Sequence, residues 1–413
     1  MANIDHNNKE KNTKNKQTDV SKNTEKKKRE NIAFDKFEVD ISSSNEKKKE
    51  DKTPKKKNPF KRVIEYLIPQ KGDTKGDIAR KILLLVAICV LIGTLTFLIR
   101  QLVSMDQSAK GSNKLAEEAG VPNSSINYNE PDRLTHPSPN IRTTAGTEEP
   151  EFIDLTPVVN TPLDVNFDYL RSQNPHTRGW IKITGTLLNH VILQNPDDDD
   201  FYLNHDFNGN YQEVSAEITS SWRNKWDGTD DNIILFGHNM KSGYGFAYVN
   251  HYVPNDVSRE PLAFYKVHPT IMLQRDGGPS ETYKVFAGIV VNTQEEYGEV
   301  FNYTTKTKFT SQEDFNDYII SIMDRSWFYT DVDLEYGDKL LTLSTCYWPL
   351  GRSKETRFAV IARKVRPGES EYVDTSVAQR NWGAKLWENY YDILETKWYG
   401  SNWDTSKLKG YDG

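Results

Sequence analysis

An uninterrupted apolar run sets the first limit on how this chain can fold. It is Ile82–Ile99, which holds 18 residues and no charged side chain. At a rise of about 1.5 Å per residue, a helix of this length spans roughly 27 Å, which matches the hydrocarbon core of a bilayer. The run starts too far from the N-terminus to be a cleaved signal peptide. We therefore expect a single transmembrane helix over residues 82–103.

The charges on the two sides of this run predict its orientation. Residues 1–81 contain 23 Lys and Arg against 14 Asp and Glu, whereas the rest of the chain holds 30 basic and 45 acidic residues. The positive-inside rule then places the N-terminus in the cytoplasm and the C-terminal part outside the cell membrane. Residues 1–81 are too polar to bury a core, so we expect a disordered basic tail. Residues 104–160, rich in Ser, Asn, Pro, Thr and Glu, predict a flexible extracellular spacer.

The remaining chain has the pattern of a mainly β domain. Short runs rich in Val, Ile, Tyr and Phe are bounded by Gly, Asn, Asp or Pro, and one helical pattern, 311–327, interrupts them with a capping box at Ser311 and Asp314. Many short strands with few helices indicate a β-barrel or sandwich. We expect the folded domain over 161–366. A Trp- and Tyr-rich C-terminal extension, 367–413, is expected to pack against it as a terminal helix. The expected strands are 180–184, 191–194, 233–236, 282–292, 339–345 and 358–365.

Cysteine usage draws attention to one residue. The chain has two cysteines, Cys89 inside the apolar run and Cys346 in the exported part. A single exported cysteine cannot form a disulfide within its domain, so this domain is not a disulfide scaffold. Cys346 ends the apolar strand pattern LLTLSTCYW, Leu340–Trp348, and a nucleophile at a strand end is held on a rigid support. Cys346 is therefore a candidate nucleophile.

Two further segments bring side chains that suit a thiol nucleophile. The strand pattern IILFGHNMKSG, Ile233–Gly243, ends in His238, and RFAVIARKV, Arg357–Val365, begins with Arg357. An imidazole can donate a proton to a departing amine, and a guanidinium can stabilise an oxyanion. Each residue also fits a plainer interpretation: the cysteine as strand packing, the histidine as a turn cap and the arginine as an ion-pair partner. The order of all three on an exported domain favours catalysis.

These segments resemble the sortases, and specifically class B. LTLSTC, Leu341–Cys346, matches the family's TLxTC signature, GHNM, Gly237–Met240, its histidine segment, and Arg357 its arginine. Upstream, NPHTRGWIKITGTLLNHVILQ, Asn174–Gln194, followed by FYLNHDFNG, Phe201–Gly209, resembles the start of a class B catalytic domain. The resemblance covers about 165–366, roughly half of the chain.

The resemblance implies a closed eight-stranded barrel with N-terminal helices and a long helix before the cysteine strand. It implies a membrane-anchored cysteine transpeptidase of the Gram-positive surface that needs no cofactor. Cys346 would cut a sorting signal, of the Asn-Pro-x-Thr type, after its Thr and carry the thioacyl intermediate, with His238 as acid and base and Arg357 on the oxyanion. The acyl group would pass to an amine of the cell wall precursor or of a pilin. The expected substrate-binding residues are Ser344, Thr345, Asn239 and Tyr347.

Other functions stay open at this point. The same residues would serve a cysteine endopeptidase that only hydrolyses, and an exported domain that binds peptide without catalysis would keep Cys346 buried and inert. The acidic run Asp197–Asp200 could bind calcium, although it lacks EF-hand spacing and a solvated turn is the simpler interpretation. His205 and His251 have no partner at zinc spacing. The exported domain has no basic patch suited to nucleic acid.

Overall fold

The computed structural model describes residues 63, 66–122, 155–254, 260–348, 356–388, 391 and 397–411. The chain divides into two units, Met1–Leu67 and Ile68–Gly413, and the fold below belongs to the second. The predicted cytoplasmic tail up to residue 62, and most of the predicted spacer, 123–154, lie outside the described residues.

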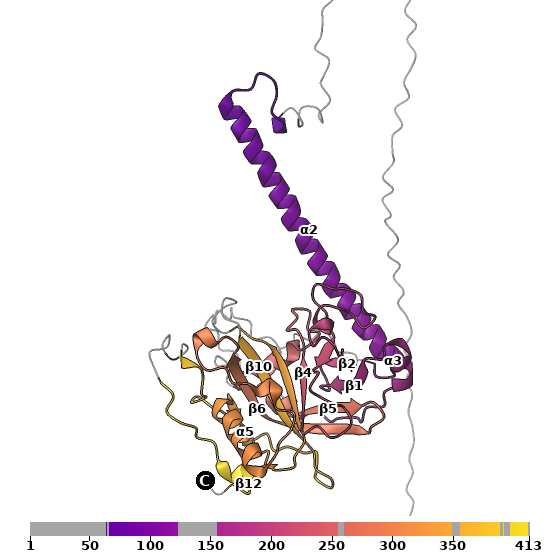
Figure 1. The fold of residues 1–413 in the computed structure, drawn as a ribbon, viewed down its shortest axis with the longest axis vertical. Coiled ribbons are helices and arrows are strands. Elements are labelled where there is room, and N and C mark those ends of the chain that lie inside the picture. Colours follow the sequence, from indigo (N-terminus) through magenta and orange to yellow (C-terminus); the bar gives the residue numbers. More distant parts are fainter. Residues whose placement is uncertain are drawn as a thin grey trace, which may run out of the picture. The chain divides into compact units, whose positions relative to one another are not determined.

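Eight strands close into a barrel, which confirms the predicted fold class (Figure 1). Their order around the barrel is β1-β2-β3-β4-β9-β10-β6-β5, with parallel pairing between β2 and β3 and between β4 and β9. Val, Ile, Leu and Phe fill the interior from alternate strand positions, as the two-residue period of a strand requires. The strands are β1 (Thr177–Lys182), β2 (Asn189–Leu193), β3 (Ile218–Ser220), β4 (Asn232–Phe236), β5 (Thr270–Arg275), β6 (Ser280–Asn292), β9 (Leu340–Cys346) and β10 (Thr356–Lys364).

Helix α5 (Gln312–Arg325) covers the outside of the barrel in the connection between β6 and β9. The predicted N-cap is confirmed, because the Ser311 hydroxyl accepts a hydrogen bond from the Asp314 N–H at 3.1 Å. The apolar face of α5 packs against outward residues of β6, β9 and β10, among them Leu340 and Ile361. This packing fixes which face of β9 looks toward α5, and it thereby fixes the side of the barrel on which Cys346 emerges.

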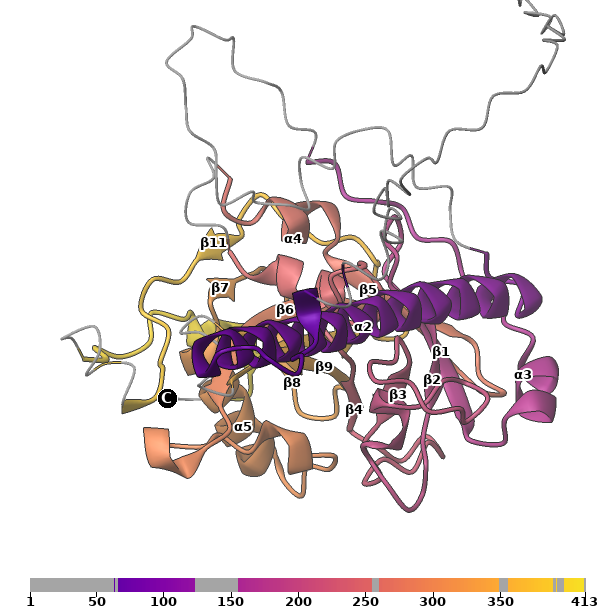
Figure 2. The ribbon, with the colours of Figure 1, turned by 90° about the horizontal axis from the view of Figure 1, so that it is seen from above.

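Helix α2 (Lys75–Glu118) contains the predicted transmembrane run and extends beyond it. One helix among the described residues is long and apolar enough to cross a membrane, and it is α2; its most apolar window has a mean hydropathy of 3.0 and no buried residue. Residues 104–118, which the composition assigns to the spacer, are helical. The helix continues because Ser108, Ser112 and Ala116 are small enough to pack closely against the domain. The shorter α3 (Phe167–Gln173) follows (Figure 2).

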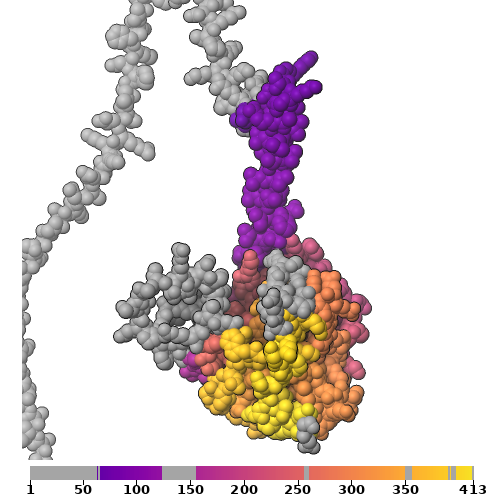
Figure 3. All heavy atoms as spheres, turned by 90° about the vertical axis from the view of Figure 1, so that its left-hand side faces the viewer, coloured from indigo at the N-terminus to yellow at the C-terminus, as the bar shows by residue number. Residues whose placement is uncertain are grey.

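The C-terminal extension joins the barrel through two small sheets. β11 (Gln379–Arg380) pairs antiparallel with β7 (Phe328–Tyr329), and β12 (Leu408–Lys409) pairs parallel with β8 (Leu334–Glu335). Figure 3 shows this yellow segment lying on the surface beside the orange part of the chain. The predicted terminal helix is wrong for most of the described part of 367–413, which forms turns, β11, a short helix and β12 because its residues pair with strands of the domain; most of residues 389–396 lie outside the described residues. The remaining short helices are η1 (Phe201–Leu203), η2 (Ala247–Tyr252), α4 (Ala263–Val267), η3 (Glu295–Tyr297), η4 (Tyr303–Thr305) and η5 (Thr405–Lys407).

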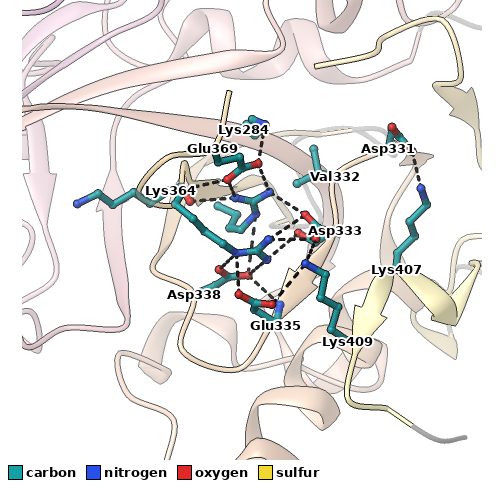
Figure 4. A network of polar contacts seen from close by, with 12 residues as sticks. Lys284, Asp331, Val332, Asp333, Glu335, Asp338, Lys364, Glu369, Lys407 and Lys409 are labelled. Atoms are coloured by element: carbon teal, nitrogen blue, oxygen red, sulfur yellow. Dashed lines mark hydrogen bonds and ion pairs between the residues drawn. The ribbon is translucent and has the colours of Figure 1, made fainter. Parts of the chain in front are cut away.

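A charged network ties the end of β10 to the strands beside it (Figure 4). Arg363, whose side chain is 1% exposed, donates to Asp333 at 3.0 Å and to Glu369 at 2.5 Å. Lys284 on β6 also binds Glu369, at 2.6 Å, and Lys409 on β12 binds Asp333 at 2.5 Å. A buried guanidinium needs such partners, because an uncompensated charge in the interior is costly. The network therefore holds β10, and the C-terminal extension, in place.

We expect Glu369→Gln to lower the free energy of unfolding by about 2 kcal/mol at pH 7, because it removes the carboxylate that Arg363 and Lys284 share and leaves the buried Arg363 charge less compensated. The hydrogen bond from Arg363 holds the pKa of Glu369 well below the ordinary value of 4.5. The stability from this carboxylate is therefore full above pH 4.5 and is lost as the pH falls below it. Urea unfolding of wild type and variant between pH 3 and pH 7 should show that the difference between their free energies of unfolding becomes smaller at acid pH. Glu295→Gln, at an exposed position, is the control. A difference in the free energy of unfolding between wild type and Glu369→Gln that does not change with pH would contradict this account.

Candidate active site

Cys346 and Arg357 face each other across two neighbouring strands. Cys346 is the last residue of β9, Arg357 is the second residue of β10, and the two are directly paired in the antiparallel register. Directly opposite residues of an antiparallel pair have their Cβ atoms roughly 4.5–5.5 Å apart on the same face of the sheet. Both residues are half-buried. The hairpin register therefore places Arg357 beside Cys346, as the sequence predicted.

His238 follows β4, which borders β9 on the side opposite to β10. β4 runs parallel to β9 with Phe236 paired to Ser344, and the Gly237 N–H extends this ladder by donating to the Ser344 carbonyl at 3.3 Å. Side chains alternate along a strand, so His238, two residues after Phe236, lies on the same face as Cys346. The three predicted catalytic residues thus come together at one end of the barrel, with Cys346 at the end of β9, Arg357 at the start of β10 and His238 two residues beyond β4.

The His238 ring is held by a backbone carbonyl. Its Nε2 donates to the Leu203 carbonyl at 2.7 Å, which leaves Nδ1 as the unprotonated nitrogen when the ring is neutral. Burial lowers the pKa of His238, the hydrogen bond to Leu203 raises it, and the positive charge of Arg357 lowers it, with a net decrease.

Two of the predicted substrate-binding residues are buried and already bonded. The Thr345 hydroxyl donates to the Gly237 carbonyl at 2.7 Å, and the Ser344 hydroxyl shares a 2.6 Å hydrogen bond with the Tyr303 hydroxyl. Ser344 is 3% exposed and Thr345 is 1% exposed. In this structure they fasten β9 to β4 and to the β6–α5 connection. Direct contact of either residue with a substrate stays a prediction.

The other two predicted substrate-binding residues lie at the surface of the site. Asn239 is exposed, and its side-chain amide is 3.4 Å from the Cys346 carbonyl. Tyr347 is half-buried, and its ring packs edge-on to Trp327 with centroids 6.1 Å apart. Both residues are therefore placed beside the cysteine, where a bound peptide could reach them.

Three residues of the site carry no sequence signal. Asn250 donates from its side chain to the Cys346 carbonyl at 3.0 Å, and Leu203 holds His238 through its backbone. Tyr303 lies under β9, where burial raises the pKa of its hydroxyl to about 12. It therefore stays neutral beside Ser344. These residues come from the short helices η1, η2 and η4, whose position depends on tertiary packing, and the sequence patterns assigned none of them a role in the site.

The acidic run Asp197–Asp200 forms a loop. The Asp199 carboxylate accepts from the Trp222 N–H at 2.6 Å, and Asp198 accepts from the Asp200 N–H at 3.0 Å. Among the residues that the structure describes, no group of three or more His, Cys, Asp or Glu is arranged to hold a metal ion. The observed role of this run is to cap the loop before β3.

When the sequence and the structure of this chain are compared with those of known proteins, they match sortases. The sequence profile of the Sortase domain matches residues 203–365. Sortase B of Listeria monocytogenes is 31% identical over 177 residues, which is 43% of this chain and 65% of that protein. Sortase B of Staphylococcus aureus is 27% identical over 199 residues, which is 48% of this chain and 74% of that protein. The X-ray structure of Clostridium perfringens sortase B is 30% identical, and the match covers 49% of this chain and 100% of that one with a TM-score of 0.41. The match thus spans slightly less than two thirds of the Listeria relative.

Proposed function

Because this chain belongs to the sortase family, we propose that it is a membrane-anchored cysteine transpeptidase with Cys346 as its nucleophile. The observation that carries the proposal is the register that pairs Cys346 with Arg357 and continues the β4 ladder toward His238. A nucleophile, an acid and a cation at the ends of three adjacent strands are the groups that acyl transfer through a thioester requires.

The first half-reaction would form a thioacyl bond. The Cys346 thiolate attacks the carbonyl carbon of the scissile amide, and the carbonyl oxygen becomes an oxyanion. The Arg357 guanidinium, which stays charged and offers several donors, stabilises that oxyanion. When the intermediate collapses, the C–N bond breaks and protonated His238 gives its proton to the departing amine. The products are a thioester on Cys346 and a free amine.

The second half-reaction would run the same steps in reverse with a new amine. Neutral His238 takes a proton from the incoming amine, whose nitrogen attacks the thioester carbonyl. The C–S bond then breaks, the thiolate is regenerated and an amide links the acyl group to the acceptor. Water in place of the amine gives hydrolysis. We propose a sorting signal cut after Thr, of the Asn-Pro-x-Thr type, as the donor, and an amine of the cell wall precursor or of a pilin as the acceptor.

The proposed topology follows from α2 and the charges on its two sides. A helix apolar enough to cross a membrane follows a basic N-terminal region, which would keep the N-terminus in the cytoplasm and the barrel outside the cell. Protease treatment of intact cells that express the full chain with tags at both ends tests this orientation. The C-terminal tag should be digested and the N-terminal tag protected, and the opposite result would overturn the topology.

Peptide turnover with and without an added amine tests the reaction type. We expect the full chain in detergent micelles to cleave a panel of sorting-signal peptides after Thr, and to give an amide-linked product when an amine such as triglycine is added. Mass spectrometry separates the ligated and hydrolysed products. Cleavage that stays purely hydrolytic with every amine would support the endopeptidase. No cleavage, together with a Cys346 that resists alkylation, would support a peptide-binding domain.

A further inference from the structure

The last part of α2, residues 104–118, docks on the barrel, and we call it the docking segment. Ala116 is fully buried, and Ser108 and Ser112 are each 5% exposed. Leu115 and Ala116 join the cluster that contains Trp180 of β1, while Met105 and Ala109 pack against the barrel core. In both Figure 1 and Figure 2 this end of α2 lies next to α3. The helix that carries the apolar run is therefore continuous with a packed part of the domain.

A short series of hydrogen bonds leads from the docking segment to the histidine ring. The Ser108 hydroxyl accepts from the Ala216 N–H at 2.8 Å. The neighbouring Ser215 N–H donates to the Leu203 carbonyl at 3.2 Å, and the same carbonyl accepts from His238 Nε2 at 2.7 Å. Ser108 thus fixes the Ser215–Ala216 peptide group. The peptide group before it carries the Ser215 N–H, which binds the Leu203 carbonyl that holds the His238 ring.

A second link reaches the loop that contains His238. Asn113 of the docking segment donates to the Tyr244 hydroxyl at 2.6 Å. Two residues later the Phe246 N–H donates to the His238 carbonyl at 2.8 Å. Gly245 between them has φ of +62°, and a Cβ there would lie 2.7 Å from the His238 carbonyl oxygen, so the loop is closed tightly on this residue. The docking segment therefore contacts both loops that set the position of the histidine.

We infer that the docking segment positions His238 for catalysis, with Ser108 and Asn113 as its positioning residues. The inference rests on the proposed function, in which His238 protonates the leaving amine. His238 lies two residues beyond the last β4–β9 pair, Phe236 with Ser344, so the strand pairing alone does not orient its ring, and the Leu203 carbonyl does. A general acid displaced by a fraction of an ångström loses much of its effect. The helix that leads out of the apolar run would thus complete the active site.

The test compares two serines of the same helix in the full chain in detergent micelles. Ser108→Ala removes the acceptor for Ala216, whereas Ser112→Ala removes a buried hydroxyl that has no hydrogen-bond partner among the described residues. Each variant is given a sorting-signal amide and a thioester of the same acyl group, whose thiolate leaves without a proton. We expect Ser108→Ala to lower kcat on the amide by roughly tenfold with little change in KM and in thioester turnover. Ser112→Ala should match wild type on both.

Several results would overturn the inference. Equal amide rates for the two serine variants would show that Ser108 has no special role, and equal losses on amide and thioester would show a general structural effect. Wild-type protein that turns over neither substrate would instead refute the proposed function. In that case histidine-labelled NMR still tests the positioning. The protected His238 ring N–H signal, assigned with His238→Gln, should persist in Ser112→Ala and disappear in Ser108→Ala, and its persistence in both would contradict the inference.

Discussion

Replacing Cys346 by alanine should lower kcat/KM for a sorting-signal peptide by at least roughly 10⁴-fold, since no other group in the site can form the thioacyl bond. The substitution removes one half-buried sulfur at the end of β9, so the thermal unfolding midpoint should stay close to that of wild type. Steady-state cleavage followed by chromatography, together with a thermal melt, measures both quantities.

Cys89→Ala is the matched control, because it removes the other cysteine, an exposed residue of α2 within the apolar run. It should leave turnover unchanged. If Cys346→Ala kept wild-type activity, or if the two variants lost activity equally, the nucleophile would have to be another residue. The assignment of the site would then be wrong.

Replacing Arg357 by lysine should lower kcat by roughly 10²–10³-fold with a smaller change in KM. The residue is paired directly with Cys346, so its guanidinium can reach the oxygen of a carbonyl bound to the sulfur. Lysine keeps the positive charge but is a compact ammonium, and it cannot reproduce the planar fork of the guanidinium. A loss in kcat without a matching loss in KM is the sign of an interaction made mainly in the transition state.

Arg223→Lys is the matched control for this charge-conserving change. Arg223 is exposed in the turn that follows β3, and its guanidinium lies 4.4 Å from the centre of the Trp222 ring. It should retain full activity. A wild-type rate for Arg357→Lys would assign the oxyanion to other donors, and a loss confined to KM would give Arg357 a role in substrate binding alone.

The features set by local sequence patterns were predictable. Runs rich in Val, Ile, Tyr and Phe located six of the eight barrel strands, whereas β3 and β5 were not predicted, and Ser311 with Asp314 located the start of α5. The register between Cys346 and Arg357 also follows from the sequence, because both residues border one hairpin connection and antiparallel strands pair the residues that flank it.

The features set by tertiary packing were not predictable. Residues 104–118 have a polar composition, which indicates a spacer, but their helix continues because small side chains fit against the barrel. Tyr303, Asn250 and Leu203 reach the site from short helices whose position is set by packing, so no periodicity or motif assigned them a role. Ser344 and Thr345 show that a motif does not by itself give the role of each of its residues. Their place in a motif suggested contact with substrate, whereas their burial and hydrogen bonds show that they join β9 to its neighbours.

The thioacyl bond on Cys346 is the central claim, and intact-mass spectrometry after an acid quench measures it directly. The full chain is mixed with excess sorting-signal peptide, without added amine, and quenched within one turnover. We predict a mass increase equal to the acyl part of the peptide, located on Cys346 by digestion and removed by hydroxylamine. Cys346→Ala should show no increase. Product release with no adduct on wild-type protein at any quench time, or an adduct that persists in Cys346→Ala, would contradict the account.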